Sequence, residues 1–527
     1  MPEPETLISS LFDNYSEDGF YDEAFLNGLP RPHYEGLVRR LATFTPEEFR
    51  GRCELADLTL VNQGITFTVY GSDQGIEKPF PVDLIPRVVP AKDWDHIEDG
   101  LIQRVRALNL FLYDVYHDQE ILRAGIVPSE LVVNAENFRR EFIGAKPPHD
   151  IYVHICGSDL IRDEKGTYCV LEDNCRTPSG VSYMLENRML MMKVFASLFK
   201  ENKVRPVDGY PAQLILNLRE LYTGSGSNPC VVLLSPGVYN SAYFEHSFLA
   251  QQMGIELVEG RDLFTEDNFV FMKTTKGKKR VDVIYRRVDD DFLDPLTFRG
   301  ESVLGCAGLV NAYRAGNVAI ANGIGTGVAD DKAVYAYVPD MIRFYLKEEP
   351  ILAQIPTYLG WREDDLKIML DKTNELVIKA ANESGGYGML IGPQATKKEV
   401  EDFRRRIRAN PRNYIGQPLI GLSRSPCFFE DHFEGRHVDL RPYILVGKNN
   451  VTVTPGGLTR VALQKGSYVV NSSQGGGSKD TWVLFDELDS APETTMSNSA
   501  AIQIQSQSQT QAQSQSQGQG QVGGENA

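Results

Sequence analysis

The sequence predicts a protein of mixed α+β and α/β class with a disordered C-terminal tail, on three observations. Residues 151–174 contain two apolar segments joined by a tight turn, which is typical of an antiparallel hairpin. Residues 207–330 alternate short apolar strands with helical segments, as in a parallel α/β layer. Residues 503–521 carry Gln at every odd position, and such a tract has too little apolar surface to offset the entropy of ordering.

Shifts in composition divide the chain into five regions. Its 527 residues are enough for three or four folded domains at about 150 residues each. The predicted regions are 1–96, of α+β character, 97–206, which carries the hairpin, 207–330, the α/β layer, 331–490, of α+β character, and 491–527, the tail.

Hydrophobic periodicity predicts the first elements in this order. The segments 62–71 and 80–90 predict strands, whereas the apolar positions of 97–123 recur at intervals of three and four and predict an amphipathic helix. The hairpin comes next, with its turn at 163–166, and the strands of the α/β layer follow it. The last folded region combines a helix, a strand, a Gly-rich turn and several further strands.

Acidic residues outnumber basic ones. Lys and Arg total 54 against 71 Asp and Glu, which gives a formal net charge of −17. A field of this sign repels polyanions, so we expect no general binding to nucleic acid or to an anionic membrane. A local cluster of basic side chains can still bind a small anion such as a nucleotide.

The sequence shows no targeting signal. Its N-terminus lacks a basic segment followed by an apolar one, and no segment approaches about 18 uninterrupted apolar residues. The seven cysteines are scattered and form no C-x-x-C pair, which is typical of free thiols in a reducing compartment. These features predict a cytoplasmic protein.

Oxygen-bearing side chains gather on the predicted hairpin. Glu172 and Asn174 are two residues apart on one strand and therefore share a face, and the turn brings Asp159 close to Glu172. Two carboxylates and an amide oxygen suit Mg²⁺ completed by water and phosphate oxygens. The alternative is a solvated hairpin face. Arg176 follows closely, where its guanidinium would stabilise charge on a reacting phosphoryl or carboxyl group.

A second candidate site lies where a strand meets a Gly-rich turn. Lys379 ends the strand, and the turn contains Ser384, Gly385, Gly386 and Gly388. Glycines allow close backbone approach, and their N–H groups bind anions, so this arrangement suits a phosphate. A purely structural turn is the alternative, because the sequence is neither a P-loop nor a dinucleotide-binding fingerprint.

Three further basic residues favour an anion site. Lys332 lies in the first turn of a predicted helix, where a bound anion explains a cation better than helix stability does. Arg441 and Arg460 lie on predicted strands. Each alone is an ordinary surface residue, but together in so acidic a chain they favour one anion-binding cleft.

No protein nucleophile is predicted. The sequence has no G-x-S-x-G elbow and no local Cys–His signature. His154 and His246 are candidate bases, but His154 lies in an apolar strand and is expected to be a core residue.

Together these motifs resemble the ATP-grasp enzymes. The first motif is D-x12-E-x-N-x-R-T-P-S-G, which begins at Asp159. The second is an Asp-Lys pair that ends at Lys332, and the third is SGGYG, which comes shortly after the strand lysine. In the ordinary family the lysines precede the acidic element, whereas here Glu172 comes about 160 residues before Lys332. That order resembles the circularly permuted ATP-grasp proteins, such as the glutathionylspermidine synthetase-like enzymes. The resemblance covers about 15–485 and implies a pre-ATP-grasp-like domain at 207–330.

The resemblance implies a role for each matching residue. The implied Mg²⁺ ligands are Asp159, Glu172 and Asn174. The implied ATP-binding residues are Lys332, Lys379, Ser384, Gly385, Gly386 and Gly388, with Gln417 beside the adenine. The implied catalytic residues are Arg176, which would neutralise an acyl phosphate, and Arg441 and Arg460, which would bind substrate or phosphate.

The resemblance also implies a reaction. An ATP-dependent ligase would join a small-molecule or peptide carboxylate to an amine through an acyl phosphate, with ATP and Mg²⁺ as cofactors. An α-helical alpha-E protein and a transglutaminase-like protein are the implied partners. A phosphotransferase on the same scaffold and a non-catalytic nucleotide-binding or scaffold protein are the alternatives.

Overall fold

The computed structural model of the chain describes residues 11–13, 15–68, 77–224, 226, 228–381, 388–470 and 476–486. Its named helices and strands all belong to one compact unit, Met1–Leu484. The predicted loop residues Ser384, Gly385 and Gly386 and the predicted tail at 491–527 lie outside the described residues.

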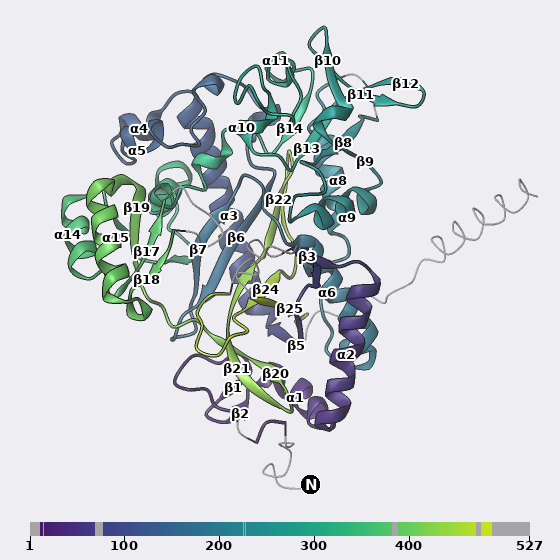
Figure 1. The fold of residues 1–527 in the computed structure, drawn as a ribbon, viewed down its shortest axis with the longest axis vertical. Coiled ribbons are helices and arrows are strands. Elements are labelled where there is room, and N and C mark those ends of the chain that lie inside the picture. The colour runs from purple at the N-terminus through teal and green to yellow at the C-terminus, as the bar shows by residue number, and fades with distance from the viewer. Residues whose placement is uncertain are drawn as a thin grey trace, which may run out of the picture. The chain divides into compact units, whose positions relative to one another are not determined.

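A mixed sheet of ten strands joins three distant parts of the sequence (Figure 1). Its main order is β15-β7-β6-β21-β24-β25-β5, with β20 paired to β21 and β22 paired to both β6 and β23. The strands are β5 (Val82–Val89), β6 (Ile155–Arg162), β7 (Tyr168–Asn174), β15 (Ala353–Gln354), β20 (Arg424–Phe429), β21 (His432–Arg441), β22 (Tyr443–Val446), β23 (Val451–Val453), β24 (Leu458–Val461) and β25 (Gly477–Val483). The hairpin therefore lies between strands from the C-terminal part of the chain.

The predicted hairpin is present as β6 and β7. The Asp163 carboxylate accepts hydrogen bonds from the N–H groups of Lys165 (2.9 Å) and Thr167 (2.8 Å), and Gly166 adopts a φ of 83° that closes the turn. Every residue of β6 is buried. Asp159 is therefore buried, whereas Glu172 and Asn174 on β7 are half-buried.

The helix predicted at 97–123 is present but divided. α3 (Ala91–Tyr116) begins after Pro90, six residues earlier than predicted, and α4 (Glu120–Arg123) follows a break. The Asp114 carboxylate accepts hydrogen bonds from the N–H groups of Glu120 (2.7 Å) and Ile121 (2.9 Å). These bonds satisfy the first amides of α4 and so stabilise the break, which apolar periodicity does not reveal.

The strand predicted at 80–90 is confirmed as β5, whereas the one predicted at 62–71 is shorter than expected. α2 (Pro46–Asn62) extends into that segment and ends before Gly64, whose φ is 66°. Of the described residues in that segment, only Thr66–Thr68 form a strand, β3, which pairs with β4 (Glu77–Pro79). Residues 69–71 lie outside the described residues.

The parallel layer predicted within 207–330 is confirmed, with strand order β14-β13-β8-β9. The strands are β8 (Val231–Leu234), β9 (Glu256–Val258), β13 (Val283–Arg286) and β14 (Ala319–Ala321), and the longer helices of this region are α8 (Tyr210–Glu220), α9 (Tyr243–Met253) and α11 (Leu309–Arg314). Between β9 and β13 the chain forms an antiparallel sheet that the sequence analysis does not predict. Its strands are β10 (Leu263–Glu266), β11 (Phe269–Thr274) and β12 (Gly277–Val281).

A separate sheet carries the strand lysine. Its order is β16-β19-β17-β18, and two helices pack on it. The elements are β16 (Tyr358–Leu359), β17 (Leu376–Ala380), β18 (Leu390–Ile391), β19 (Tyr414–Pro418), α14 (Glu363–Asp371) and α15 (Lys397–Ala409). Leu376 and Ile378 of β17 are buried in the core with the helices. Because side chains alternate along a strand, Val377 and Lys379 point to the opposite face.

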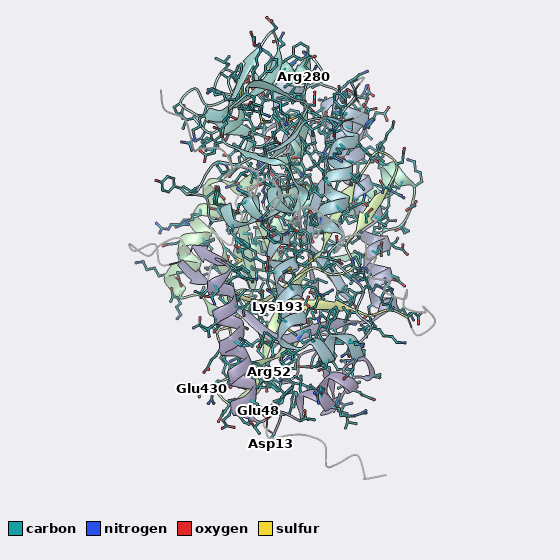
Figure 2. All side chains as sticks on the ribbon, turned by 90° about the vertical axis from the view of Figure 1, so that its right-hand side faces the viewer. Asp13, Glu48, Arg52, Lys193, Arg280 and Glu430 are labelled. Atoms are coloured by element: carbon teal, nitrogen blue, oxygen red, sulfur yellow. The ribbon has the colours of Figure 1, made fainter. Side chains whose placement is uncertain are left out.

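The N-terminal helix α2 is hydrogen-bonded to elements that are distant in the sequence. Arg50 donates a hydrogen bond to the carbonyl of Glu430 (2.9 Å), in the turn between β20 and β21. Arg52 donates to the carbonyl of Val194 (2.6 Å), beside Lys193 at the end of α6 (Figure 2). The remaining elements are β1 (Phe25–Leu26), β2 (Leu29–Pro30), α1 (Glu35–Leu41), α5 (Ser129–Val133), α6 (Val181–Val194), α7 (Ala196–Glu201), α10 (Asp290–Leu293), α12 (Lys332–Tyr335) and α13 (Val338–Met341).

Two sequence expectations concern the whole chain. Within the described ranges, no helix combines the length and the apolar character needed to cross a bilayer. The seven cysteines are all free thiols, as their spacing predicts.

Asn322 joins the parallel layer to the hairpin. Its side chain is 2% exposed and follows β14 directly. Oδ1 accepts hydrogen bonds from the N–H groups of His154 (2.7 Å) and Ile155 (2.8 Å), and Nδ2 donates to the carbonyls of Ile155 (2.6 Å) and Cys175 (2.8 Å). One amide therefore binds both ends of the hairpin.

We expect Asn322→Ala to lower the free energy of unfolding by about 2–4 kcal/mol, because it leaves several buried backbone groups without partners. Chemical denaturation measures this change. The matched control is Asn317→Ala, which removes one exposed bond to the carbonyl of Asn268 and should cost about 1 kcal/mol or less. Equal losses in the two variants would contradict the assigned role of Asn322.

Candidate functional site

Asp159 lies at the centre of a buried ion cluster. Its side chain is 1% exposed and accepts hydrogen bonds from Arg441 (Nε to Oδ1, 2.5 Å; Nη2 to Oδ2, 2.8 Å) and from Arg460 Nη2 (2.6 Å). Arg460 Nε also donates to Asp439 (2.9 Å). Burial raises the pKa of the Asp159 carboxyl, but Arg441 and Arg460 outweigh burial and hold the pKa well below its usual range.

The three predicted metal ligands lie on one part of the hairpin. Asp159 pairs with Glu172 across the strands. The Glu172 carboxylate lies 3.5 Å from the Lys332 ammonium, and Asn174 donates through Nδ2 to the carbonyl of Gly157 (3.0 Å). The Asp159 charge is thus balanced by arginines, whereas Glu172 faces a lysine.

A cleft lies between the hairpin and the sheet that carries Lys379. Its walls are largely apolar and include Ile161, Leu171, Ile355, Val377, Met389, Ile391, Leu419, Ile420, Leu422, Val469 and Val470. Its polar lining includes Asp159, Glu172, Lys332, Lys379, Gln417, Asp439 and Arg460. The cleft therefore combines apolar walls with a set of charged side chains, two of which are lysines.

Lys379 and Gln417 bind each other in this cleft. Lys379 Nζ donates a hydrogen bond to Gln417 Oε1 (2.9 Å), and Gln417 Nε2 donates to Thr357 Oγ1 (3.0 Å). Burial lowers the pKa of the Lys379 ammonium to about 8, an effect that the Glu172 carboxylate partly offsets. The lysine is thus a cation at neutral pH that gives up its proton more readily than an exposed lysine.

A second, more polar cavity adjoins the cleft. Glu172 and Lys332 line both hollows. The rest of its lining consists of Asn137, Asp173, Asn174, Arg176, Thr177, Asp330, Asp331 and Ala381. We refer to this hollow as the polar cavity.

Arg176 lies between two carboxylates. Its Nε is 3.4 Å from Asp289 and 3.7 Å from Asp330 Oδ2. Neither distance is that of a short hydrogen bond, so the guanidinium is held loosely and remains partly exposed (24%). The structure places the predicted acyl-phosphate residue in the polar cavity rather than in the apolar cleft.

The structure separates the two predicted substrate arginines. Arg460 lines the cleft, whereas Arg441 lines neither hollow among the described residues. Both guanidinium groups contact Asp159, so their clearest role is to neutralise the charge beneath the cleft. Gly388 is described with a φ of 66°, but it is not among the lining residues of either hollow.

Sequence reasoning missed the residues that hold the loop after Arg176. Glu245 accepts hydrogen bonds from the N–H of Gly180 (2.6 Å) and pairs with Arg287 (3.0 Å). Arg287 donates to the carbonyl of Pro178 (2.6 Å). Glu245 and Arg287 belong to the segments 239–246 and 281–295, which are part of the family resemblance, but spacing alone assigns them no contact. His154, expected in the core, is confirmed there at 2% exposure.

The residues present fit a nucleotide with a divalent cation. Apolar walls suit a base, the buried lysines suit phosphates, and carboxylate and amide oxygens are the donors that Mg²⁺ prefers. No group of three or more His, Cys, Asp or Glu side chains in the described part of the chain is arranged to hold a metal alone. A cation here would therefore use Asn174 and oxygens from its ligand as well.

Comparison with known proteins identifies the family. The sequence model of the circularly permuted ATP-grasp type 2 family matches residues 86–462. The chain belongs to this family. An uncharacterized protein of Synechocystis sp. is 56% identical over 472 residues, which cover 89% of this chain and 98% of the relative. An uncharacterized protein of Mycobacterium tuberculosis is 51% identical over 486 residues, which cover 91% of this chain and 88% of the relative.

One further sequence relative of this ATP-grasp protein and one solved structure with a similar fold carry informative names. A Frankia casuarinae protein provisionally named glutamate–cysteine ligase 2-2 is 40% identical over 481 residues, which cover 91% of this chain but only 55% of the Frankia protein. A glutathione synthetase-like effector from Globodera pallida superposes with a TM-score of 0.55 at 12% identity, covering 84% of this chain and 98% of the effector. This likeness confirms the predicted circularly permuted ATP-grasp fold.

We expect Asp159→Asn to lower the free energy of unfolding by about 3–5 kcal/mol, because it leaves Arg441 and Arg460 with too little negative charge in a buried cluster. Urea denaturation of purified protein measures the change. Glu266→Gln is the control, because its exposed pair with Lys278 should contribute less than about 1 kcal/mol. A loss for Asp159→Asn as small as that of the control would contradict the ion cluster.

Proposed function

We propose that this protein is a Mg-ATP-dependent ligase that joins a carboxylate to an amine through an acyl phosphate. Membership of the ATP-grasp family supports an ATP-dependent ligase in general. The observation that carries the finer proposal is the junction between the apolar cleft and the polar cavity at Glu172 and Lys332. Such a junction lets a nucleotide in one hollow meet an acceptor in the other.

The apolar cleft is the proposed nucleotide site. The adenine would lie between the apolar walls beside Gln417, and Lys332 and Lys379 would contact the phosphates. Ser384, Gly385, Gly386 and Gly388 follow Lys379 in the sequence and remain the proposed phosphate loop. Binding of the phosphates would replace the hydrogen bond between Lys379 and Gln417 by a charge-assisted contact.

The hairpin is the proposed Mg²⁺ site. Glu172, Asn174 and Asp159 would hold the ion, which when bound would neutralise phosphate charge. Asn174 already uses its amide nitrogen within the sheet, so its oxygen is the atom available to a cation. Asp159 would share its carboxylate between the ion and the two arginines.

The polar cavity is the proposed site of ligation. Attack by the substrate carboxylate on the γ-phosphorus of ATP forms an acyl phosphate and releases ADP, and an amine then displaces phosphate. Arg176 faces the cavity, where its guanidinium would bind the acyl phosphate and the departing phosphate. No protein nucleophile is required, because positioning and charge neutralisation provide the catalysis.

The names of relatives support the class of reaction and leave the substrates open. The Frankia protein is almost twice as long as the region matched here, so its name does not transfer to this chain. Peptide-like carboxylates and amines are the proposed substrates. An alpha-E protein and a transglutaminase-like protein are proposed partners on the family resemblance alone.

The proposal is tested with purified protein, Mg-ATP and hydroxylamine in the presence of pooled amino acids, short peptides and polyamines. Hydroxylamine traps an acyl phosphate as a hydroxamate, so we expect equal amounts of hydroxamate and ADP with one carboxylate. A stable phosphorylated product with no hydroxamate would show a phosphotransferase instead. ATP binding without any turnover would favour the non-catalytic scaffold.

We expect Lys379→Ala to weaken ATP binding at least tenfold and to abolish turnover, because a charge-assisted contact contributes about 1.5–3 kcal/mol. Since the pKa of Lys379 is lowered to about 8, wild-type affinity for ATP should fall as the pH rises from 7 to 9, where the lysine loses its proton. Lys379→Arg should remove that pH dependence, because arginine stays charged. Calorimetric titration with Mg-ATP at both pH values measures these affinities, and full activity of Lys379→Ala would refute the assignment.

A further inference from the structure

Four carboxylates line the polar cavity, and three of them are already engaged. Glu172 faces Lys332 and belongs to the proposed metal site. Asp173 accepts hydrogen bonds from Arg104 (2.7 and 2.9 Å) and from Ser158 (2.8 Å). These contacts leave both carboxylates committed to other groups.

The third engaged carboxylate is that of Asp331. Its Oδ1 accepts a hydrogen bond from the N–H of Ala333 (2.8 Å) and so caps α12, and its Oδ2 accepts from Arg412 (2.9 Å). Its side chain is only 4% exposed. Asp331 therefore holds the helix that carries Lys332.

Asp330 differs from these three. Its Oδ1 accepts a hydrogen bond from the N–H of Cys175 (2.6 Å), which fixes the carboxylate beside the end of the hairpin. Its Oδ2 lies 3.7 Å from Arg176, beyond hydrogen-bond distance, and the side chain is 19% exposed. Among the described carboxylates that line the cavity and are not assigned to the proposed metal site, Asp330 is the one with an oxygen left to accept a proton from a ligand.

We propose that Asp330 is the general base that removes a proton from the amine substrate. This inference rests on the proposed ligase function and assigns the second half of its reaction to a named group. An aliphatic amine is protonated at neutral pH and cannot attack an acyl phosphate until it loses that proton. Asp330 lies next to Arg176, the group proposed to bind the acyl phosphate, so it is within reach of the attacking nitrogen.

The ammonium gives one proton to Asp330 Oδ2, and the nitrogen lone pair then attacks the carbonyl carbon of the acyl phosphate. The C–N bond forms, the C–O bond to phosphate breaks, and phosphate leaves with the electron pair. The second proton of the amine goes to the departing phosphate, and Asp330 returns its proton to solvent.

The electrostatics of the site agree with this role. Burial raises the pKa of the Asp330 carboxyl to about 7, although Arg176, the N–H of Cys175 and Lys332 act in the opposite direction and Glu172 adds to the rise. A base with a pKa near the working pH is efficient because about half of it is ionised and it still accepts a proton readily.

The test compares two nucleophiles on Asp330→Asn, whose side-chain oxygen can still accept the N–H of Cys175. Hydroxylamine is uncharged near neutral pH and needs no base, whereas the pooled amino acids, peptides and polyamines do. We expect hydroxamate formation within about twofold of wild type and amide formation lower by about 10²–10⁴-fold. Raising the pH should restore about tenfold of the amide rate per pH unit, as more amine becomes uncharged in solution.

Two further variants distinguish a base from a structural residue. Asp330→Glu retains a carboxylate and should recover part of the amide rate. Asp289→Asn removes the other carboxylate near Arg176 but does not line the cavity, so its amide rate should stay within about threefold of wild type. Equal loss of hydroxamate and amide in folded Asp330→Asn, or an equal amide defect in Asp289→Asn, would overturn the proposal. Absence of hydroxamate from the wild-type enzyme would instead refute the ligase function itself.

Discussion

Two arginines that bind one buried aspartate set the geometry of the whole cleft. Asp159 lies on β6, Arg441 on β21 and Arg460 on β24, and these strands are consecutive in the main order of the central sheet. A shift of one residue in either pairing would turn a charged side chain to the opposite face and leave a buried charge without a partner. The ion cluster therefore fixes the register of the three strands, and with it the position of Glu172 opposite Asp159.

The parallel layer acts on the same hairpin from its other side. Asn322 binds both ends of the hairpin, and Glu245 and Arg287 hold the loop that follows Arg176. Because these contacts come from buried, hydrogen-bonded side chains, the loop is held by a rigid framework rather than by its own sequence. The layer thereby helps to shape the polar cavity without contributing the side chains that would contact the nucleotide.

Local sequence patterns predict those parts of the site whose geometry follows from the alternation of side chains along a strand. The hairpin, its turn and the pairing of Asp159 with Glu172 follow from two sequence features. Side chains alternate between the faces of a strand with a period of two, and a short connection joins the two apolar segments. The contacts of Arg441 and Arg460 with Asp159 did not follow, because the two arginines lie 282 and 301 residues from it along the chain, and spacing cannot show which distant charges meet. For the same reason the sequence does not reveal Asp330. Its ability to accept a proton depends on burial and on the distance to Arg176 rather than on a motif.

The parallel pairing of β5 with β25 has a consequence for synthesis of the protein. The salt bridge between Asp83 and Lys479 joins residues 396 positions apart. At about 5–20 residues per second, a ribosome needs roughly 20–80 s to deliver the second strand after the first has emerged. During that interval β5, whose side chains are mostly apolar and buried in the finished sheet, has an unpaired edge. The edge of β5 is therefore open to incorrect strand pairing until β25 has been synthesised.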